Sequence, residues 1–392
     1  MKILYLITKS ELGGAQTYVA QLAEYFSSQK NEIAVMSFPG GWLEDKMIEE
    51  KIKFYPNKYF TNSLNLFKHL KAIKKIKEVI KIFKPDIIHC NSSTAGFLGR
   101  IVIKNKVPAL FTAHGWAFTE GVPFLRKRWA ILAEKFISRY CQKIICVSEF
   151  DKNLALKYKI TSENKLIVIH HGVKIGNSLI DQRPPKESDL KSGPTGRVTF
   201  EYQKIIFIGR LTEPKNPLLL LKAFNDLSPL LKEKSEIIIV GEGSKRKILE
   251  KFIQKNNLNN KIKLLGSIPR DKVFNLLKDS HIFVLTTNYE GLPYTILEAM
   301  SCGLAIIATD VNGVKEAVEN CGFLVKKGSR EEVKECLKKL LENPELTQKI
   351  GRKCREKVIK KFSLEKMLKK TEEVYQNLIL GHNPQKWDID KV

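Results

Sequence analysis

Residues 204–241 read KIIFIGRLTEPKNPLLLLKAFNDLSPLLKEKSEIIIVG. The stretch begins and ends with a short run of Ile, Phe and Val that a glycine terminates, as in strands buried on both faces of a sheet. The leucine-rich segment 216–229 between the two runs has the length and pattern of a helix. We therefore predict a strand–helix–strand unit, whose two strands must lie parallel because the connection between them is long.

The same alternation continues through the second half of the chain. Further strands are predicted at 261–266, 281–286, 305–310 and 322–325, and helices at 244–255, 270–279 and 293–301, with two or three more running to about residue 380. Repeated alternation of this kind predicts a parallel sheet with helices on both faces.

The first half has the same organisation. Its predicted strands include 2–7, 86–90, 108–114 and 143–148, and a long basic helix is predicted at about 64–83. Between the halves, residues 174–203 are rich in Pro, Gly, Ser and charge, which is typical of a linker. We expect an N-terminal Rossmann-like domain over 1–175, a linker or irregular loop over 176–203, a C-terminal Rossmann-like domain over 204–375 and a tail over 376–392.

Composition narrows the class of protein. The 392 residues carry 67 Lys and Arg against 42 Asp and Glu, a net charge of +25, which favours anionic partners. No cluster of basic residues with stacking aromatics indicates a nucleic-acid module, so we expect no nucleic-acid partner. The seven cysteines lack Cys-x-x-Cys spacing and are expected to be reduced thiols without a zinc site. No apolar run approaches a membrane span, so we expect a cytoplasmic protein, soluble or bound to a membrane surface.

Basic residues follow the first strand of the second half. The run FIGRLTEPKN (207–216) places Arg210 and Lys215 in a loop between a strand and a helix. A glycine turn, two cations and a helix N-terminus together can bind a phosphate. The alternative is an ordinary loop between a strand and a helix that carries surface charges. In the first half, Gly13 and Gly14 form the corresponding turn, and they match neither a dinucleotide fingerprint nor a P-loop.

One histidine of the first half lies at the carboxyl end of a predicted strand. His114 follows a strand in TAHGWAF (112–118), at the end where ligands usually bind. There it can bond a substrate hydroxyl or a phosphate, and the alternative is a packed histidine of the core.

Two carboxylates stand eight positions apart in NYEGLPYTILEAMSCG (288–303). Glu290 precedes a predicted helix, and Glu298 lies more than one turn inside it. Carboxylates accept strongly from sugar hydroxyls, and the N–H groups at Gly291 and Leu292, before Pro293, can take a phosphate. A nucleotide-sugar would use every part of this segment, whereas a helix N-terminus with a favourable acidic residue is the simpler alternative.

From about residue 2 to 375 the chain resembles family 4 glycosyltransferases of the GT-B fold, in which two Rossmann-like αβα domains face each other across a cleft. The resemblance is carried by Glu290–Glu298 with EGLP inside, and by GGAQ, HG, GRLTEPK and GLAIIATDVNGVKE. It implies a retaining transferase of hexose or N-acetylhexosamine that uses no metal and no cofactor. The only Asp-x-Asp, Asp388 to Asp390, lies in the polar tail.

The resemblance also implies a role for each candidate residue. Gly13 and Gly14 would line the donor diphosphate and the acceptor side, and His114 would contact the donor sugar. Arg210 and Lys215 would neutralise the leaving diphosphate. Glu290 would hold sugar hydroxyls, Glu298 the ribose, and the residues Gly291, Leu292 and Pro293 would border the phosphates. The family's usual Asn-Gly appears here as HHGV (170–173), and the linker is long, which leaves the inter-domain geometry open.

We expect a UDP-sugar donor, a glycan or polyprenyl-linked acceptor, and a role in cell-surface polysaccharide or glycolipid synthesis. The basic helix 63–84 and the run FLRKRWA (124–130) suggest contact with an anionic membrane surface, on the inner face of the plasma membrane. In the helix we expect Leu66, Leu70, Ile73, Ile76 and Ile80 to pack as one stripe. Alternatives are a UDP-N-acetylglucosamine 2-epimerase-like enzyme of the same architecture, a basic nucleic-acid-binding protein and an inactive sugar-binding subunit.

Overall fold

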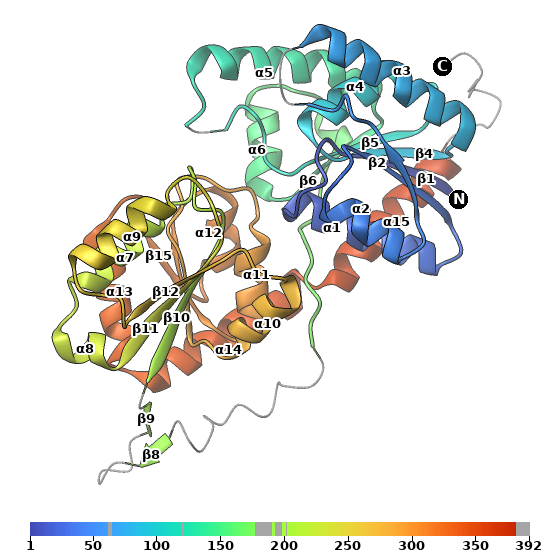
Figure 1. Ribbon diagram of the computed structural model, residues 1–392. Coiled ribbons are helices and arrows are strands. Elements are labelled where there is room, and N and C mark those ends of the chain that lie inside the picture. The colour runs from blue at the N-terminus through green and yellow to red at the C-terminus, as the bar shows by residue number, and fades with distance from the viewer. Residues whose placement is uncertain (62–64, 120, 177–189, 193–197, 201, 382–392) are drawn as a thin grey trace. The chain divides into compact units, whose positions relative to one another are not determined.

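The structure is a computed structural model that describes residues 1–61, 65–119, 121–176, 190–192, 198–200 and 202–381. Its contacts divide the chain into two units, each built on its own parallel sheet (Figure 1). The first unit contains Met1–His171 together with the chain from Glu365, and the second contains Gly172–Leu364. The expected pair of Rossmann-like sheets is confirmed.

The first unit holds a sheet in the order β3-β2-β1-β4-β5-β6-β7, with every neighbouring pair parallel. Its strands from β2 to β6 in the sheet order are mostly apolar and buried, because helices cover both faces, whereas the edge strands β3 and β7 are more exposed. The strands are β1 (Lys2–Leu6), β2 (Glu32–Ser37), β3 (Lys53–Pro56), β4 (Ile87–Cys90), β5 (Ala109–Ala113), β6 (Lys143–Cys146) and β7 (Leu166–Val168).

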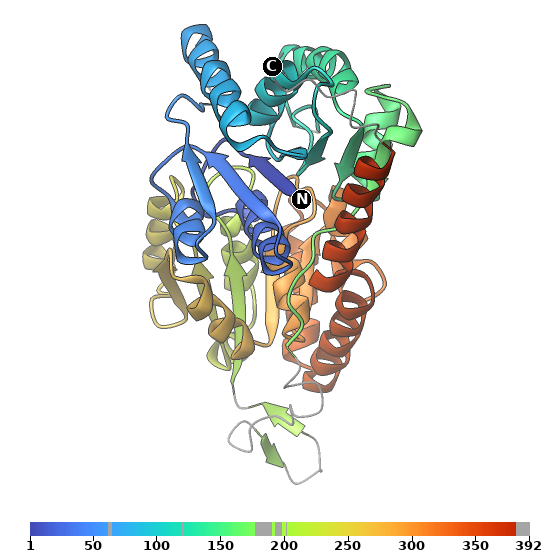
Figure 2. The same ribbon diagram turned by 90° about the vertical axis from the view of Figure 1, so that its right-hand side faces the viewer.

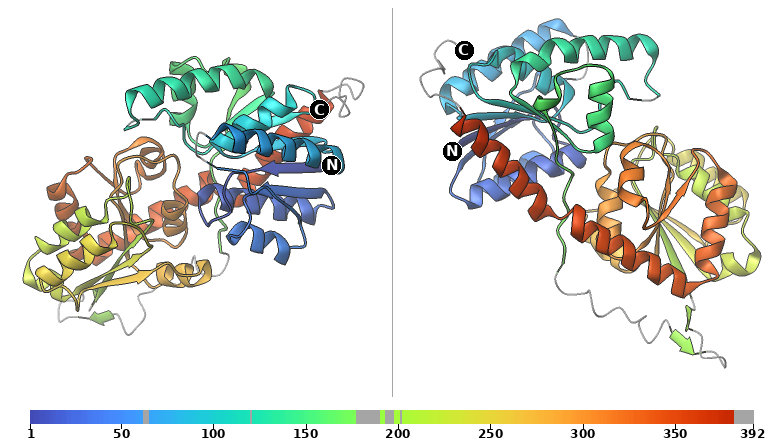
Figure 3. Two further views of the ribbon diagram at one scale, coloured as in Figure 1. Left: turned by 45° about the horizontal axis from the view of Figure 1, so that its top comes forward. Right: turned by 180° about the vertical axis from the view of Figure 1, so that it is seen from behind.

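Two groups of helices cover this sheet. The helices α3, α4 and α5 pack in series on one face, and α1 and α15 lie on the other (Figure 3). The helices of the unit are α1 (Gly14–Ser28), α2 (Trp42–Glu49), α3 (Leu66–Phe83), α4 (Ser93–Ile103), α5 (Phe124–Ile137), α6 (Glu149–Lys157) and α15 (Leu364–Leu380). At the start of α6, Ser148 Oγ accepts from Asp151 N at 3.1 Å and donates to its carboxylate at 2.7 Å, an interaction that stabilises the helix N-terminus.

The last helix belongs to a different unit from the one that the sequence analysis assigned it to. We placed residues up to 375 in the second domain and 376–392 in a tail, but α15 packs on the first unit and stays helical to Leu380. Tyr25 Oη donates to Glu372 at 2.9 Å, and the rings of Phe26 and Tyr375 lie 4.9 Å apart. The apolar stripe of α15 is visible in the sequence, but which sheet it covers is not. Residues 382–392, including Asp388 and Asp390, lie outside the described residues.

A buried polar network ties α15 to the first sheet. Tyr375 Oη lies 2.6 Å from His89 Nδ1 and 3.2 Å from Tyr5 Oη, and His89 Nε2 lies 2.6 Å from Thr112 Oγ1. All four side chains are fully buried. Burial lowers the pKa of His89 to about 3, so its imidazole is neutral and uses both nitrogens for hydrogen bonds.

The second unit holds a parallel sheet in the order β12-β11-β10-β13-β14-β15. The helices α7, α9 and α13 lie on one face and α10, α11 and α14 on the other (Figures 1 and 2). Its strands are β10 (Gln203–Ile208), β11 (Ser235–Val240), β12 (Ile262–Gly266), β13 (Ile282–Leu285), β14 (Ala305–Thr309) and β15 (Phe323–Val325). Its helices are α7 (Pro217–Asn225), α8 (Pro229–Glu233), α9 (Arg246–Lys255), α10 (Arg270–Lys278), α11 (Tyr294–Ser301), α12 (Asn312–Val318), α13 (Arg330–Leu341) and α14 (Pro344–Lys361).

One sequence expectation needs adjustment in this unit, and another lies mostly outside the described residues. The helix predicted at 216–229 is two helices, because Pro229 cannot continue α7 and instead opens α8 after its cap Ser228. The linker expected at 176–203 lies mostly outside the described residues. Within it, β8 (Leu190–Ser192) pairs antiparallel with β9 (Val198–Phe200).

We expect the substitution His89→Gln to flatten the pH dependence of the first unit's stability. Below its ordinary pKa of 6.5, His89 takes up a proton in the unfolded chain but not in the folded one, so stability is lost as the pH falls. From about pH 7.5 to about pH 5.5 this loss amounts to about 1.4 kcal/mol.

Urea unfolding followed by tryptophan fluorescence measures this difference, because no tryptophan lies between residues 172 and 364. The variant should lose correspondingly less stability than the wild-type chain over the same interval. Parallel pH curves for the two proteins would contradict the assignment of a neutral, buried imidazole.

Candidate functional site

Two motif-bearing loops of the second unit lie side by side. The strands β10 and β13 are neighbours in the sheet although they are distant in sequence, so the loops that leave their carboxyl ends start at the same edge. Asn216 N donates to Thr286 O at 2.7 Å, and Asn288 N donates to Pro214 O at 3.0 Å. These bonds join the loop 209–216 to the loop 286–293.

An ion pair connects the same two loops. Lys215 Nζ pairs with Glu290 Oε1, and only 13% and 17% of the two side chains are exposed. Thr287 Oγ1 donates to the same carboxylate oxygen at 3.2 Å, and Thr287 N donates to Thr309 Oγ1 at 2.7 Å. Lys215 and Glu290, which were predicted from separate motifs, are thus held in contact with each other and largely shielded from water.

Arg210 differs from Lys215 in its surroundings. Its side chain is exposed, and none of the residues that the structure describes forms an ion pair with it. The acid nearest in sequence, Glu213, is instead engaged by Lys245 and by Asn288 Nδ2, the latter at 3.1 Å. The guanidinium of Arg210 is therefore available to an anionic ligand.

Glu298 lies buried on α11, with a cationic partner that the sequence patterns did not indicate. Arg270, the first residue of α10, pairs with its Oε1. Burial raises the pKa of the Glu298 carboxyl, and the charge and hydrogen bond of Arg270 oppose that rise. The two residues are far apart in sequence and no motif joins them, so only the packing of α10 on α11 brings them together.

Glycines keep the backbone of these loops closely packed. A Cβ at Gly313, in α12, would lie 1.8 Å from Gly291 O, and one at Gly241 would lie 2.0 Å from Gly209 O. Gly241 also has a positive φ of +139°. Leu292 and Pro293 next to Gly291 are buried. Gly241, which in the sequence marked only the end of a strand, thus supports the turn that holds Arg210.

In the first unit, Gly13 and Gly14 lie at the start of α1. Gly13 is the N-cap in an extended conformation, and an added Cβ would approach closely only the side-chain oxygen of Gln16, at 2.7 Å. Packing within the described chain therefore does not require glycine at position 13. Both glycines follow β1, whose neighbour β4 marks the point where the strand order of this sheet reverses.

His114 follows β5 in the first unit and is held on both nitrogens. Its Nδ1 lies 3.0 Å from His171 Nε2, and its Nε2 lies 3.4 Å from Asn91 Oδ1. Tyr18 packs edge-on against the ring, with centroids 5.0 Å apart. Burial, and secondarily the neighbouring His171 and His89, lower the pKa of His114 well below its ordinary value. Its imidazole is consequently a neutral hydrogen-bonding group rather than a cation.

The sequence analysis did not connect Asn91 or His171 with His114. Asn91 follows β4 directly, and His171 follows β7 within HHGV. Their positions after strands of one sheet were the available signal, because parallel strands end at a common edge.

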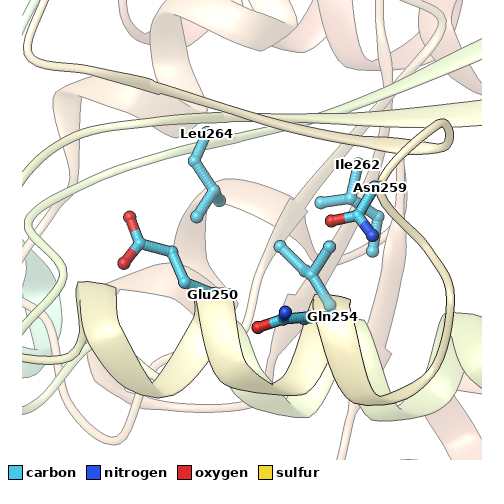
Figure 4. A pocket seen from close by; sticks show the side chains of 6 residues that line it. Glu250, Gln254, Asn259, Ile262 and Leu264 are labelled. Carbon is cyan, nitrogen blue, oxygen red and sulfur yellow. The ribbon is translucent and has the colours of Figure 1, made fainter.

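Other features of the described structure lie elsewhere. A hollow of about 340 Å³ lies between α9 and β12, lined by Glu250, Ile253, Gln254, Asn259, Ile262 and Leu264 (Figure 4), and includes no candidate residue. Within the described ranges, no group of three or more His, Cys, Asp or Glu side chains is arranged to hold a metal ion. All seven cysteines are free.

Two family profiles match the chain. The family described as Glycosyltransferase Family 4 matches residues 12–176, and the family described as Glycosyl transferases group 1 matches residues 198–357. The first profile covers every strand of the first sheet except β1, and the second covers all strands of the second sheet.

Curated relatives align over most of the chain. A UDP-Gal:alpha-D-GlcNAc-diphosphoundecaprenol alpha-1,3-galactosyltransferase of Escherichia coli is 29% identical, over 97% of this chain and 98% of that protein. The O-antigen biosynthesis glycosyltransferase WbnH, also of Escherichia coli, is 28% identical over 82% of this chain and 85% of its own length.

Solved structures share the fold. HepE of Anabaena, in complex with UDP and glucose, superposes with a TM-score of 0.78 at 19% identity, over 96% of this chain and 100% of that chain. A glycosyltransferase of Rickettsia africae superposes with a TM-score of 0.75 at 26% identity, over 97% and 99% of the two chains.

We expect Gly313→Ala to loosen the turn that contains Glu290 and Gly291. The added methyl group cannot fit 1.8 Å from Gly291 O, so the turn or α12 must move, at a cost of about 1–3 kcal/mol. Hydrogen-exchange mass spectrometry should show faster amide exchange across 286–293.

Gly176→Ala is the matched control, because nothing lies within 4 Å of a Cβ at that position. Unchanged exchange across 286–293 in the Gly313 variant would show that this contact does not hold the turn.

Proposed function

The chain belongs to glycosyltransferase family 4, and on that premise we propose that it moves a hexose or N-acetylhexosamine, with retention of configuration, from a UDP-sugar to a glycan or lipid-linked acceptor. The Escherichia coli relative aligned over 97% of this chain is named for UDP-Gal and for an acceptor on diphosphoundecaprenol, which supports both substrate classes. The O-antigen relative supports a role in cell-surface polysaccharide synthesis.

The observation that carries the proposal is the joining of the Lys215 and Glu290 loops at one edge of the second sheet. A nucleotide-sugar presents phosphate oxygens, which need cations, and hydroxyl groups, which need strong acceptors. Lys215 and exposed Arg210 supply the cations, and Glu290 supplies the acceptor. An ordinary surface loop does not require this combination.

In the proposed reaction, negative charge grows on the departing diphosphate while the sugar becomes oxocarbenium-like. Lys215 is already fixed and partly desolvated, so its charge stabilises the leaving group without reorganisation at the moment of bond cleavage. Arg210 binds the outer phosphate oxygens. Gly291, Leu292 and Pro293 border the phosphates just before α11.

The carboxylates orient the donor. Glu290, held by Thr287, accepts from sugar hydroxyls, and Glu298, held by Arg270, accepts from the ribose hydroxyls. The Nε2 of neutral His114 bonds a hydroxyl of the donor sugar in place of its 3.4 Å contact with Asn91, while Gly13 and Gly14 line the diphosphate and the acceptor. Attack on the face that the diphosphate leaves gives retention, and the leaving phosphate takes the proton of the acceptor hydroxyl. No step uses a metal ion.

A membrane surface is the further partner in this proposal, because an undecaprenol-type acceptor lies in a bilayer. The net charge of +25 favours an anionic one, which the enzyme would approach from the cytoplasmic side. No helix among the described residues is long and apolar enough to cross a bilayer.

The direct test incubates the protein with a panel of nucleotide-sugars and a membrane lipid extract, and scores release of nucleoside diphosphate and labelled lipid. We expect UDP release and labelled lipid from one UDP-sugar, undiminished by EDTA. Product formed without acceptor would indicate the 2-epimerase-like alternative, and donor binding without turnover would indicate a sugar-binding subunit.

Variants then separate the roles of the two loops. Arg210→Ala should lower kcat about 10²–10³-fold because it removes one cation at the leaving group. Glu298→Ala and Glu298→Gln should raise the KM for the donor about tenfold or more, because each removes a charged hydrogen-bond acceptor.

Arg352→Ala, which removes an exposed arginine of the same unit, is the matched control and should leave both constants unchanged. Wild-type turnover in the Arg210 variant would refute the leaving-group assignment.

A further inference from the structure

The helix α5 carries a large apolar stripe on its outward face. Positions four, three and four residues apart share one face of a helix. On this face the exposed fractions are 70% for Leu125, 72% for Trp129, 50% for Leu132 and 48% for Phe136. Apolar stripes of globular helices normally face the core, so the orientation of this one needs a reason.

The opposite face of α5 is anchored, which fixes the stripe outward. Glu134 is buried and accepts two hydrogen bonds, at 2.9 and 3.1 Å, from one guanidinium nitrogen of Arg100 on α4. Arg100 is fully buried, and its guanidinium lies 4.0 Å above the ring of Phe111 in β5. Ile137, one turn after Glu134, is also buried. Rolling α5 to hide the stripe would therefore break a buried ion pair.

Basic side chains flank the stripe. Arg126, Arg128 and Lys135 are exposed on α5, and Lys127 lies partly exposed beside them. The only acid of the helix is Glu134, whose charge Arg100 already neutralises. The outward face of α5 is thus apolar along its centre and positive along its edges.

The helix α3 extends the same kind of surface. Both α3 and α5 pack against α4 on one face of the first sheet (Figure 3). Of the stripe that we expected to pack on that sheet, Ile76 and Ile80 are buried and Ile73 is partly buried, but Leu66 and Leu70 are not. Leu66, Phe67 and Leu70 are 68%, 80% and 54% exposed, among exposed lysines that include Lys68 and Lys71. The first turns of α3 therefore resemble α5.

We propose that the outward face of α5 inserts into the headgroup region of an anionic lipid bilayer and is the element that holds the enzyme at its lipid-linked acceptor. Trp129 and the aliphatic stripe would enter the interface, while Arg126, Arg128 and Lys135 bind the headgroup phosphates. This inference deepens the proposed function and rests on its lipid-linked acceptor.

Charge argues for a bilayer rather than a second copy of the chain. In a symmetric dimer the same patch meets itself, so the arginines and lysines beside the stripe would face one another without acids to pair with. An anionic lipid surface supplies both the apolar interior and the counter-charge.

The test is flotation of the full chain with vesicles of phosphatidylcholine containing phosphatidylglycerol, at low and at high salt. We expect binding that falls with salt and is weak on phosphatidylcholine alone. The pair Trp129→Gln and Leu132→Gln, which leaves the net charge unchanged, should weaken partitioning about tenfold or more. The matched pair Leu230→Gln and Ile248→Gln, exposed apolar residues of the second unit, should not.

The charged edge is tested separately. Arg126→Gln with Arg128→Gln should lower binding to anionic vesicles about tenfold or more, since each basic residue near the surface contributes about a fivefold factor. Lys247→Gln with Lys251→Gln on α9 makes the same charge change in the second unit and should have little effect. Lipids brominated in the acyl chain should quench fluorescence in the wild-type chain more than in Trp129→Phe.

Two outcomes overturn the inference: unchanged vesicle binding in the Trp129 and Leu132 variant, or no vesicle binding by the wild-type chain, with or without a dimer in sedimentation that this variant abolishes. A water-soluble acceptor analogue keeps the two proposals apart. Transfer to it without vesicle binding would refute the role of α5 alone, and vesicle binding without any sugar transfer would refute the proposed function alone.

Discussion

The Lys215–Glu290 ion pair depends on a constraint that operates throughout the second unit: the carboxyl ends of parallel strands meet at one edge of a sheet. Because β10 and β13 are neighbours, loops separated by about seventy-five residues start side by side and are joined by backbone hydrogen bonds. The pair is only slightly exposed, so its charges act in a medium of lower effective dielectric constant than water. For the proposed binding of phosphate and hydroxyl groups, this arrangement strengthens the electrostatic interactions of both side chains and fixes their orientation.

The first unit meets a different requirement near β4 and β5, because the histidines there are buried and neutral. His89 and His114 are neutral, and each uses both ring nitrogens for hydrogen bonds. A buried polar network stabilises a single arrangement only if its members are satisfied, and here Tyr375 of α15 supplies one of the partners. The helix α15 thus completes a hydrogen-bond network whose other members lie in the strands of the first sheet.

In α5, a buried ion pair determines which side chains are exposed at the surface. Anchoring Glu134 to Arg100 fixes the inner face of the helix and thereby exposes its apolar stripe. For an enzyme whose proposed acceptor is held in a bilayer, such a surface is useful, because the lipid supplies the apolar environment that the core does not. The strand–helix repeat that brings the Lys215 and Glu290 loops to one edge of the second sheet also places α5 on one face of the first sheet.

The sequence by itself determined the two parallel sheets, the approximate element bounds, the family, and the loops that carry Arg210, Lys215, Glu290 and His114. These follow from local signals: apolar runs, glycine turns and short motifs. Tertiary structure alone decided that Arg270 meets Glu298, that His171 and Asn91 hold His114, that α15 belongs with the first sheet, and that Leu66 and Leu70 remain exposed. In the first three cases the partners are distant in sequence. The exposure of Leu66 and Leu70 could not be predicted because periodicity shows that a helix has an apolar face without showing what that face will contact.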